Sequence, residues 1–131
     1  PFSAKTLTGK EIKVTADTTE QVVVVRFWAD WCPFCEKEMR EIETVYRELK
    51  GKGVTILAVN VGQDRDTVQH FIGRLGISYT ALLDPESEIA KSYGVIGLPT
   101  TFFVDRQGLI HSKILGESNA DVFRRALEPL L

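Results

Sequence analysis

The chain has 131 residues, of which 44% are hydrophobic and 26% are charged, and its net charge is -2. This length fits one domain with a sizeable core, so we expect a single domain over residues 1–131. The mixed charge does not indicate a nucleic-acid-binding surface, and no apolar stretch approaches the roughly 20 residues of a membrane span. The first residue is Pro1 rather than Met, which predicts a processed or trimmed product that has lost a signal peptide or anchor.

The first half of the chain predicts two short strands, a buried strand, a long helix and another strand. Residues 2–15 are expected to form two short strands joined by a turn. The β-branched run at 22–27 is typical of a central strand that is covered on both faces. A helix is expected over 33–49, and a second buried strand over 54–61.

The second half predicts further helices and a second pair of antiparallel strands. A helix over 66–75, apolar on one side, precedes a short strand at 80–83. Asp84 is expected to cap a short helix that starts at Pro85. The last predicted elements are a strand at 100–104, an antiparallel strand at 109–115 and a helix at about 120–130. This order predicts an α/β fold with a mixed central sheet and helices on both faces.

Cys32 and Cys35 are the only two cysteines of the chain. Two intervening residues let both sulfurs meet across the first turn of a helix, so a disulfide can form and break with little backbone change. If Cys32 is the N-cap, Pro33 is the first helical residue, where a missing N–H is harmless. The helix start favours a thiolate, so we expect a lowered pKa for Cys32 as the attacking sulfur. Cys35 should be more buried and resolve the mixed disulfide.

An inert structural disulfide and half of a metal site are the alternative interpretations of the cysteine pair. A zinc site would need two further ligands. The two histidines, His70 and His111, stand alone and lack ligand-like spacing. We therefore expect a redox-active pair and no metal site.

Glu38 interrupts the apolar side of the predicted helix that follows the cysteines. Its spacing to Ile42 and Leu49 places it with the apolar residues, one turn after Cys35, whereas Glu43 falls on the charged side. A carboxylate on an apolar face loses hydration, so we expect its pKa to rise. Glu38 could then accept the Cys35 proton when the mixed disulfide is resolved. The alternative is a glutamate at the edge of the apolar face that extends to water.

Pro99 stands directly before the strand predicted at 100–104. Because proline cannot donate a hydrogen bond to a sheet, it is tolerated at the first position of a strand or in a turn, where a cis bond can occur. The sequence alone does not place Pro99 beside Cys32.

Two segments together resemble the thioredoxin superfamily: Phe-Trp-Ala-Asp-Trp-Cys-Pro-Phe-Cys at 27–35 and Gly-Leu-Pro-Thr-Thr-Phe-Phe-Val at 97–104. Three features narrow the resemblance to the TlpA/ResA-like branch. These are the N-terminal hairpin, an inserted strand–helix unit that begins near Ala58, and Glu38 three residues after the second cysteine. The resemblance implies a thioredoxin-like fold. It also implies a periplasmic or otherwise extracytoplasmic thiol-disulfide oxidoreductase that reduces protein disulfides, in a branch that includes proteins of cytochrome c maturation.

The resemblance also implies a role for each matching residue. Cys32 matches the nucleophilic cysteine, Cys35 the resolving cysteine, and Glu38 the acid that tunes the dithiol. Pro99 matches the cis-proline that packs against the active site. Leu98 matches the residue whose backbone pairs with a bound substrate chain.

Aromatic residues and a proline complete the site that the resemblance implies. Trp28 and Trp31 match its aromatic flank, although simple core packing for Trp28 and a surface wall for Trp31 are the plainer interpretations. Trp31 and Pro33 are expected to contact substrate. Arg26 departs from thioredoxins, which carry a buried acid six residues before the first cysteine. A nearby Arg26 could pair with Glu38 and lower its pKa, or Arg26 could be a solvated strand end.

The resemblance implies no organic cofactor beyond the redox-active Cys32–Cys35 disulfide. The implied partners are a disulfide-containing client protein, apocytochrome c being one candidate, and a membrane thiol electron donor; the protein is expected to be a monomer. A protein-disulfide oxidant is the alternative, because Pro33-Phe34 is not the commonest dipeptide of the branch and this dipeptide helps to set the redox potential.

Proteins of two other classes can be built on this or a related fold. A metal-handling protein on this fold typically has three residues between its cysteines and an additional histidine. A peroxidase on the related peroxiredoxin scaffold needs a lone cysteine in a Pro-x-x-x-Thr-x-x-Cys segment. Neither pattern occurs in this chain.

Overall fold

The computed structural model describes residues 2–14, 18, 20–32, 35–116 and 118–131. Its strands are β1 (Phe2–Thr6), β2 (Glu11–Val14), β3 (Val22–Trp28), β4 (Val54–Val61), β5 (Thr80–Asp84), β6 (Thr100–Val104) and β7 (Ile110–Leu115). Its helices are α1 (Cys35–Leu49), α2 (Arg65–Leu75), α3 (Glu88–Ser92) and α4 (Ala120–Leu127), and short 3-10 turns follow α1 and α4 at Lys50–Lys52 and Glu128–Leu130.

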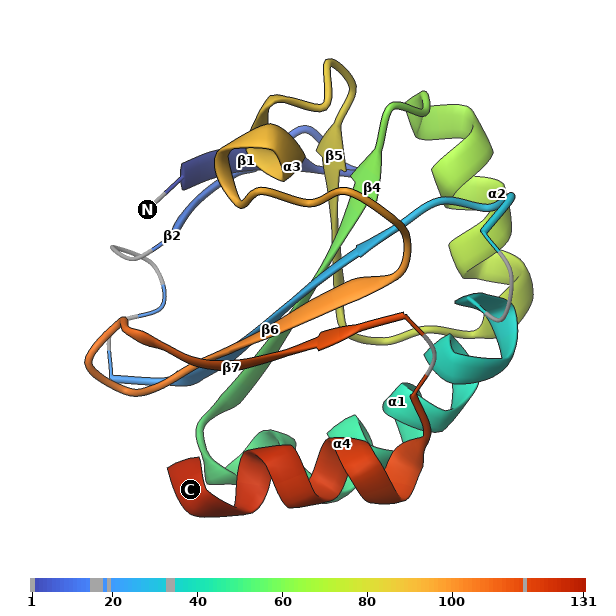
Figure 1. Cartoon of the computed structure of the whole chain (residues 1–131). Coiled ribbons are helices and arrows are strands. Elements are labelled where there is room, and N and C mark those ends of the chain that lie inside the picture. Colours follow the sequence, from blue (N-terminus) through green and yellow to red (C-terminus); the bar gives the residue numbers. More distant parts are fainter. Residues whose placement is uncertain (1, 15–17, 19, 33–34, 117) are drawn as a thin grey trace.

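The described strands form one mixed sheet in the order β2-β1-β5-β4-β3-β6-β7 (Figure 1). β3, β4 and β5 are parallel neighbours, whereas β6 runs antiparallel to β3 and β7 antiparallel to β6. The hairpin of β1 and β2 joins the sheet through an antiparallel pairing of β1 with β5. Residues of α1, α2 and α4 enter the core on one face of the sheet, and residues of α3 enter it on the other. The predicted α/β fold, with a mixed sheet and helices on both faces, is confirmed.

β3 is the centre of the molecule, and all seven of its residues are buried. One face of β3 contributes Val22, Val24 and Trp28 to the core beneath α1, and the other contributes Val23, Val25 and Phe27 to the core beneath α3. β-branched side chains pack well on both faces of a pleated sheet, which explains why this run forms the central strand. The strand predicted at 22–27 is confirmed and is one residue longer.

The short helix after β5 begins later than the sequence predicts. The sequence favours a helix that starts at Pro85 with Asp84 as its cap, but α3 begins at Glu88 and Asp84 is the last residue of β5. Parallel pairing with β4 extends the strand to Asp84 and leaves Pro85 in a turn. The Asp84 carboxylate still accepts hydrogen bonds from the backbone N–H groups of Ile89 (3.2 Å) and Ala90 (2.9 Å).

Glu43 is buried, although the helical pattern places it on the charged side of α1. Its side chain is 8% exposed. Its carboxylate accepts hydrogen bonds from the backbone N–H (2.9 Å) and hydroxyl (2.5 Å) of Ser78 and from Nε of Arg47 (2.7 Å). Burial raises the pKa of Glu43, but the donors of Ser78 and Arg47 outweigh it and hold the pKa below its ordinary value. Glu43 therefore fastens the connection between α2 and β5 onto α1.

Glu43→Gln is expected to destabilise the protein at neutral pH and to make its unfolding free energy less dependent on pH. A carboxylate with a lowered pKa adds stability above its ordinary value of 4.5, and this stability is lost as the pH falls through the folded-state pKa. We expect the variant to lose about 1–2 kcal/mol of unfolding free energy at pH 7 and nearly nothing once the pH is well below the folded-state pKa of Glu43. Urea unfolding at several pH values measures both effects.

The exposed Glu86 in the turn after β5 provides the control. Glu86→Gln should change the unfolding free energy little at any pH. If the Glu43→Gln variant lost the same unfolding free energy at pH 7 and at the lowest pH of the series, the proposed ionic anchoring of the α2–β5 connection would be wrong.

Candidate active site

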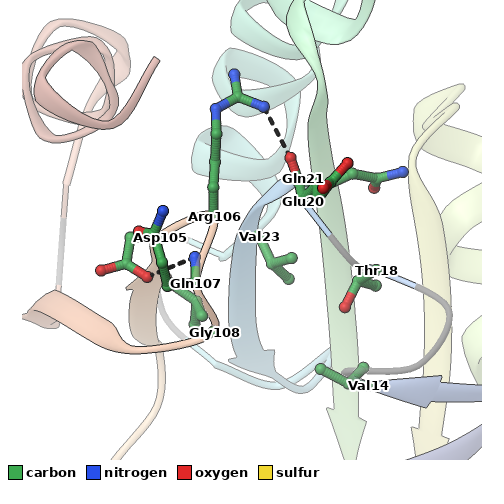
Figure 2. Close-up of a pocket in the computed structure, with 10 residues that line it drawn as sticks. Val14, Thr18, Glu20, Gln21, Val23, Asp105, Arg106, Gln107 and Gly108 are labelled. Atoms are coloured by element: carbon green, nitrogen blue, oxygen red, sulfur yellow. Dashed lines mark hydrogen bonds between the residues drawn. The ribbon is translucent and has the colours of Figure 1, made fainter.

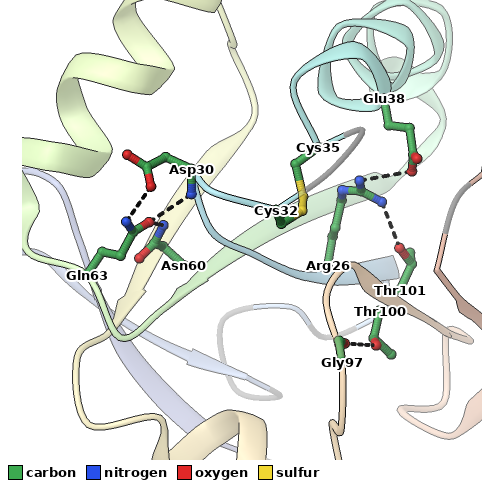
Figure 3. Close-up of a disulfide and its surroundings, with 10 residues drawn as sticks. All are labelled: Arg26, Asp30, Cys32, Cys35, Glu38, Asn60, Gln63, Gly97, Thr100 and Thr101. Carbon is green, nitrogen blue, oxygen red and sulfur yellow. Dashed lines mark hydrogen bonds and ion pairs between the residues drawn. A yellow bond between two sulfur atoms is a disulfide. The ribbon is translucent and has the colours of Figure 1, made fainter.

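Cys32 and Cys35 form a disulfide just beyond the C-terminal end of β3, with their Cα atoms 5.6 Å apart (Figure 3). Cys35 is the first residue of α1, and its N–H donates to the carbonyl of Cys32 (3.3 Å). Cys32 is 6% exposed and Cys35 is completely buried. This order of burial suits an attacking Cys32 and a resolving Cys35. Pro33 lies outside the described residues, and so does the predicted start of the helix.

A buried ion pair connects β3 with α1. Arg26 is 0% exposed and Glu38 is 2% exposed. Nη2 of Arg26 donates to Oε1 of Glu38 (3.0 Å), and Nη1 donates to Oγ1 of Thr101 (3.1 Å) on the neighbouring strand β6. The helical pattern correctly places Glu38 with the buried residues of α1. The alternative interpretations, a solvated Arg26 and a Glu38 that extends to water, are wrong.

The environment of the pair opposes charge on Arg26. Burial lowers the pKa of Arg26, and the attraction of Glu38 acts against this effect. In return the guanidinium favours the ionised form of the Glu38 carboxylate. This acts against burial, which favours the protonated form and is the basis of the prediction from the sequence. The hydroxyl of Tyr79 donates to the carbonyl of Met39 (3.2 Å), and burial raises the pKa of Tyr79 well above its ordinary value.

The loop before β6 lies at the same end of the sheet as the disulfide, because β6 pairs with β3. The peptide bond between Leu98 and Pro99 is cis, and Pro99 is buried. Leu98 packs against the core cluster that contains both cysteines. Within the described part of the chain, no hydrogen bond involves the Leu98 backbone, whereas the Pro99 carbonyl accepts one from the N–H of Gly116 (2.8 Å).

The two tryptophans near the disulfide have different environments. Trp28 is completely buried and packs against Phe71 of α2, with ring centroids 4.9 Å apart. Trp31, directly before Cys32, is 67% exposed. Ile96, in the loop before the cis-proline, is 96% exposed and was not singled out from the sequence. The loops on this side of the sheet therefore present large apolar side chains to solvent.

Three polar side chains that the sequence analysis missed hold the loop before Cys32 (Figure 3). The Oε1 atom of Gln63 accepts hydrogen bonds from the backbone N–H of Asp30 (2.9 Å) and from Nδ2 of the buried Asn60 (2.9 Å). Nε2 of Gln63 donates to Oδ1 of Asp30 (2.6 Å). An asparagine within the apolar run of β4 is the signal that could have identified this network.

A hollow of about 350 Å³ lies at the opposite end of the sheet, where β3 begins and β6 ends (Figure 2). The guanidinium of Arg106 reaches across it and donates to the carbonyls of Glu20 and Lys52 (2.9 Å each). These contacts join three loops to one another. Arg106 and its partners therefore lie at the end of the sheet that is opposite to the disulfide.

The described residues contain neither a cluster of metal ligands nor a helix that could span a membrane. No group of three or more His, Cys, Asp or Glu side chains among them could hold a metal ion. None of the described helices has the length and apolar character needed to cross a membrane.

The AhpC/TSA family model matches residues 1–113. The chain is 34% identical to the thiol-disulfide oxidoreductase ResA of Geobacillus thermodenitrificans over 129 residues, which cover 98% of this chain and 74% of that protein. The chain belongs to the AhpC/TSA family and to its ResA-like thiol-disulfide oxidoreductases. ResA of Bacillus cereus is 33% identical with the same coverage.

Solved structures share the fold over almost the whole chain. StoA from Bacillus subtilis is 28% identical, with a TM-score of 0.83 and coverage of 97% of this chain and 96% of that one. MTB DsbF is 27% identical, with a TM-score of 0.90 and coverage of 99% and 95%. The thioredoxin-like fold is thereby confirmed, and the enzyme is a thiol-disulfide oxidoreductase whose two cysteines form one disulfide.

Gln63→Ala is expected to loosen the loop before Cys32. The substitution removes the acceptor of the Asp30 N–H, so the amide of Asp30 should exchange with solvent at least about tenfold faster, and the unfolding free energy should fall by about 1 kcal/mol. Amide hydrogen exchange followed by NMR measures the first effect. Gln69→Ala, an exposed glutamine on α2, is the matched control. Unchanged exchange at Asp30 in the Gln63 variant would show that the network does not hold the loop.

Proposed function

We propose that this ResA-like oxidoreductase reduces disulfides of client proteins outside the cytoplasm. The observation that carries the proposal is the Cys32–Cys35 disulfide itself, in which the residue with access to solvent stands beside an exposed Trp31 and the other is completely buried. Two structural relatives are described as secreted proteins, which supports the location. They are a thiol-disulfide isomerase from Corynebacterium glutamicum (28% identical, TM-score 0.89) and a Mycobacterium tuberculosis disulfide oxidoreductase (25% identical, TM-score 0.86).

The proposed reaction has two thiol-disulfide exchange steps. The thiolate of Cys32 attacks one sulfur of the client disulfide, so a bond forms between Cys32 and the client, and the other client sulfur leaves as a thiolate that takes a proton from water. Cys35 then loses its proton, for which we assign Glu38 as acceptor, and attacks Cys32. The mixed disulfide breaks, the second client sulfur leaves as a thiolate that takes a proton from water, and the protein is left oxidised by two electrons as its own disulfide.

The client is proposed to bind as an extended segment across the loops around the disulfide. Trp31 and Ile96 provide exposed apolar surface there, and apolar surface that remains exposed on a folded protein commonly marks a binding site. The backbone of Leu98, next to the cis bond to Pro99, is proposed to pair with the client backbone. Pro33, between the cysteines, is proposed to contact the same segment.

The oxidised enzyme must be reduced again before each turnover. We propose a membrane thiol protein as the electron donor, apocytochrome c as one candidate client, and a monomer as the working form. A redox potential near that of thioredoxin, about -270 mV, would fit a reductase, whereas about -120 mV would fit the alternative of a protein-disulfide oxidant. Equilibration with glutathione of known ratio measures this potential and decides between the two directions.

Trapping of the mixed disulfide tests the proposed function most directly. Cys35→Ser removes the resolving thiol, so client proteins should remain bound to Cys32 and be released by a reducing agent. The double variant Cys32→Ser/Cys35→Ser is the control and should retain nothing. If the Cys35→Ser protein, expressed in an oxidising compartment, forms no adduct with any protein, protein disulfides are not its substrates.

Trp31→Ala is expected to weaken client binding without altering the dithiol. Loss of an exposed aromatic contact should raise KM for a protein disulfide such as that of insulin about three- to tenfold and leave kcat nearly unchanged. Leu109→Ala, which truncates another side chain that is 67% exposed but lies between β6 and β7 away from the disulfide, is the matched control. Equal KM values for the two variants would contradict the proposed binding surface.

A further inference from the structure

The central strand carries a positive charge on a face that otherwise contributes apolar side chains to the core. Arg26 points toward α1 from the same face of β3 as Val24 and Trp28, and its side chain is completely buried. It stands six residues before Cys32 on the strand that leads to the disulfide. A buried guanidinium is costly to the fold unless it is paired, so its presence at this place needs a physical reason.

The guanidinium is fixed by two elements that also build the active site. Glu38 of α1 and Thr101 of β6 hold its two Nη atoms at 3.0 Å and 3.1 Å. Glu38 lies one turn after Cys35 on the same helix, and Thr101 lies two residues after the cis-proline. In the view of Figure 3 the guanidinium lies between the disulfide and the Glu38 carboxylate. In this view Arg26 is thus the member of the ion pair on the side of the sulfurs, and its Nη atoms point away from them, toward Glu38 and Thr101.

We propose that Arg26 is a positioning residue of the thiol-disulfide exchange, which holds a positive charge beside the dithiol so that its thiolates form more readily, while Glu38 limits this effect. Ionisation of a thiol leaves a negative charge on sulfur, and burial makes such a charge unfavourable. A fixed positive charge nearby offsets that cost, and the carboxylate of Glu38 behind it reduces the offset.

The other titratable groups around Arg26 do not cancel its positive charge. Tyr79, from the connection between α2 and β5, keeps its proton because burial raises its pKa. Glu43, one turn and a half further along α1, is engaged with Ser78 and Arg47. Among the described residues, Glu38 and Tyr79 are the titratable side chains that interact electrostatically with Arg26.

Opposite effects of the two single substitutions test the proposal. In Glu38→Gln the charge of Arg26 is no longer balanced, so alkylation of Cys32 in the reduced protein at pH 6 should become about threefold faster or more. In Arg26→Met it should become slower by a similar factor. The equilibrium with glutathione should shift toward the reduced protein in the first variant and toward the disulfide in the second, because a stabilised thiolate favours the reduced form.

The double variant Arg26→Met/Glu38→Gln removes both charges and leaves no unpaired charge in the core, so it should fold and lie between the single variants. If Arg26→Met does not fold, Glu38→Gln and the double variant still decide the question. Thr101→Val is the matched control, because it removes a contact of Arg26 but no charge. It should lower the stability of the protein and leave the alkylation rate of Cys32 at pH 6 unchanged.

Three results would overturn the proposal. The first is an alkylation rate of Cys32 in Glu38→Gln that is slower or unchanged. The others are equal alkylation rates in Glu38→Gln and the double variant, or a change of the rate in Thr101→Val as large as that in Glu38→Gln. The inference rests on thiol-disulfide exchange and not on the proposed client or direction. A protein that traps no client can still show the opposite shifts, and a protein that traps clients can lack them, so the two failures are distinguishable.

Discussion

The pairing of Arg26 with Glu38 is the interaction on which the arrangement of the active site depends. Each charge would cost several kcal/mol to bury alone, and their attraction offsets this cost only when the geometry is good and further donors and acceptors are satisfied. The hydrogen bond from Arg26 to Thr101 supplies part of that satisfaction. The three residues belong to β3, α1 and β6. A shift of any one of these elements would therefore cost the buried Arg26 either its ion pair with Glu38 or its hydrogen bond to Thr101. The fold therefore fixes these elements relative to one another at the place where they carry the disulfide.

A second polar cluster holds the loop between the end of β3 and Cys32. Gln63, after β4, binds both the backbone and the carboxylate of Asp30, and the buried Asn60 orients Gln63. The ion pair fixes the base of the loop from within the core, and this network fixes its outer part. Between these supports Trp28 is anchored in the core and Trp31 is directed to solvent. The accessible cysteine thus follows a rigid segment, which favours a reproducible approach of a client sulfur.

Local patterns of the sequence predicted most of the fold, because the central strands are continuous apolar runs and the long helices each have an apolar side. The same periodicity placed Glu38 among buried residues, and the spacing of the cysteines located the active site. Arg26 could not be placed in this way, because a charge within a β-branched run fits both a solvated strand end and a buried pair. Its partners are 12 and 75 residues away along the chain. Glu43 was misplaced for a related reason, since the loop residue Ser78 that covers it comes from another part of the chain.

The charge that the core must neutralise also changes the free-energy difference between the two redox states. The disulfide is uncharged, so the oxidised protein gains nothing from the positive charge of Arg26, whereas a nearby thiolate of the reduced protein does. An apolar side chain in place of the ion pair would serve the stability of the fold equally well or better. A buried pair whose positive member lies on the side of the sulfurs is therefore better explained by the chemistry of the dithiol than by the demands of folding. On this argument the direction of electron flow is set in part by how completely Glu38 cancels the field of Arg26, a quantity that the motif Cys-Pro-Phe-Cys alone does not contain.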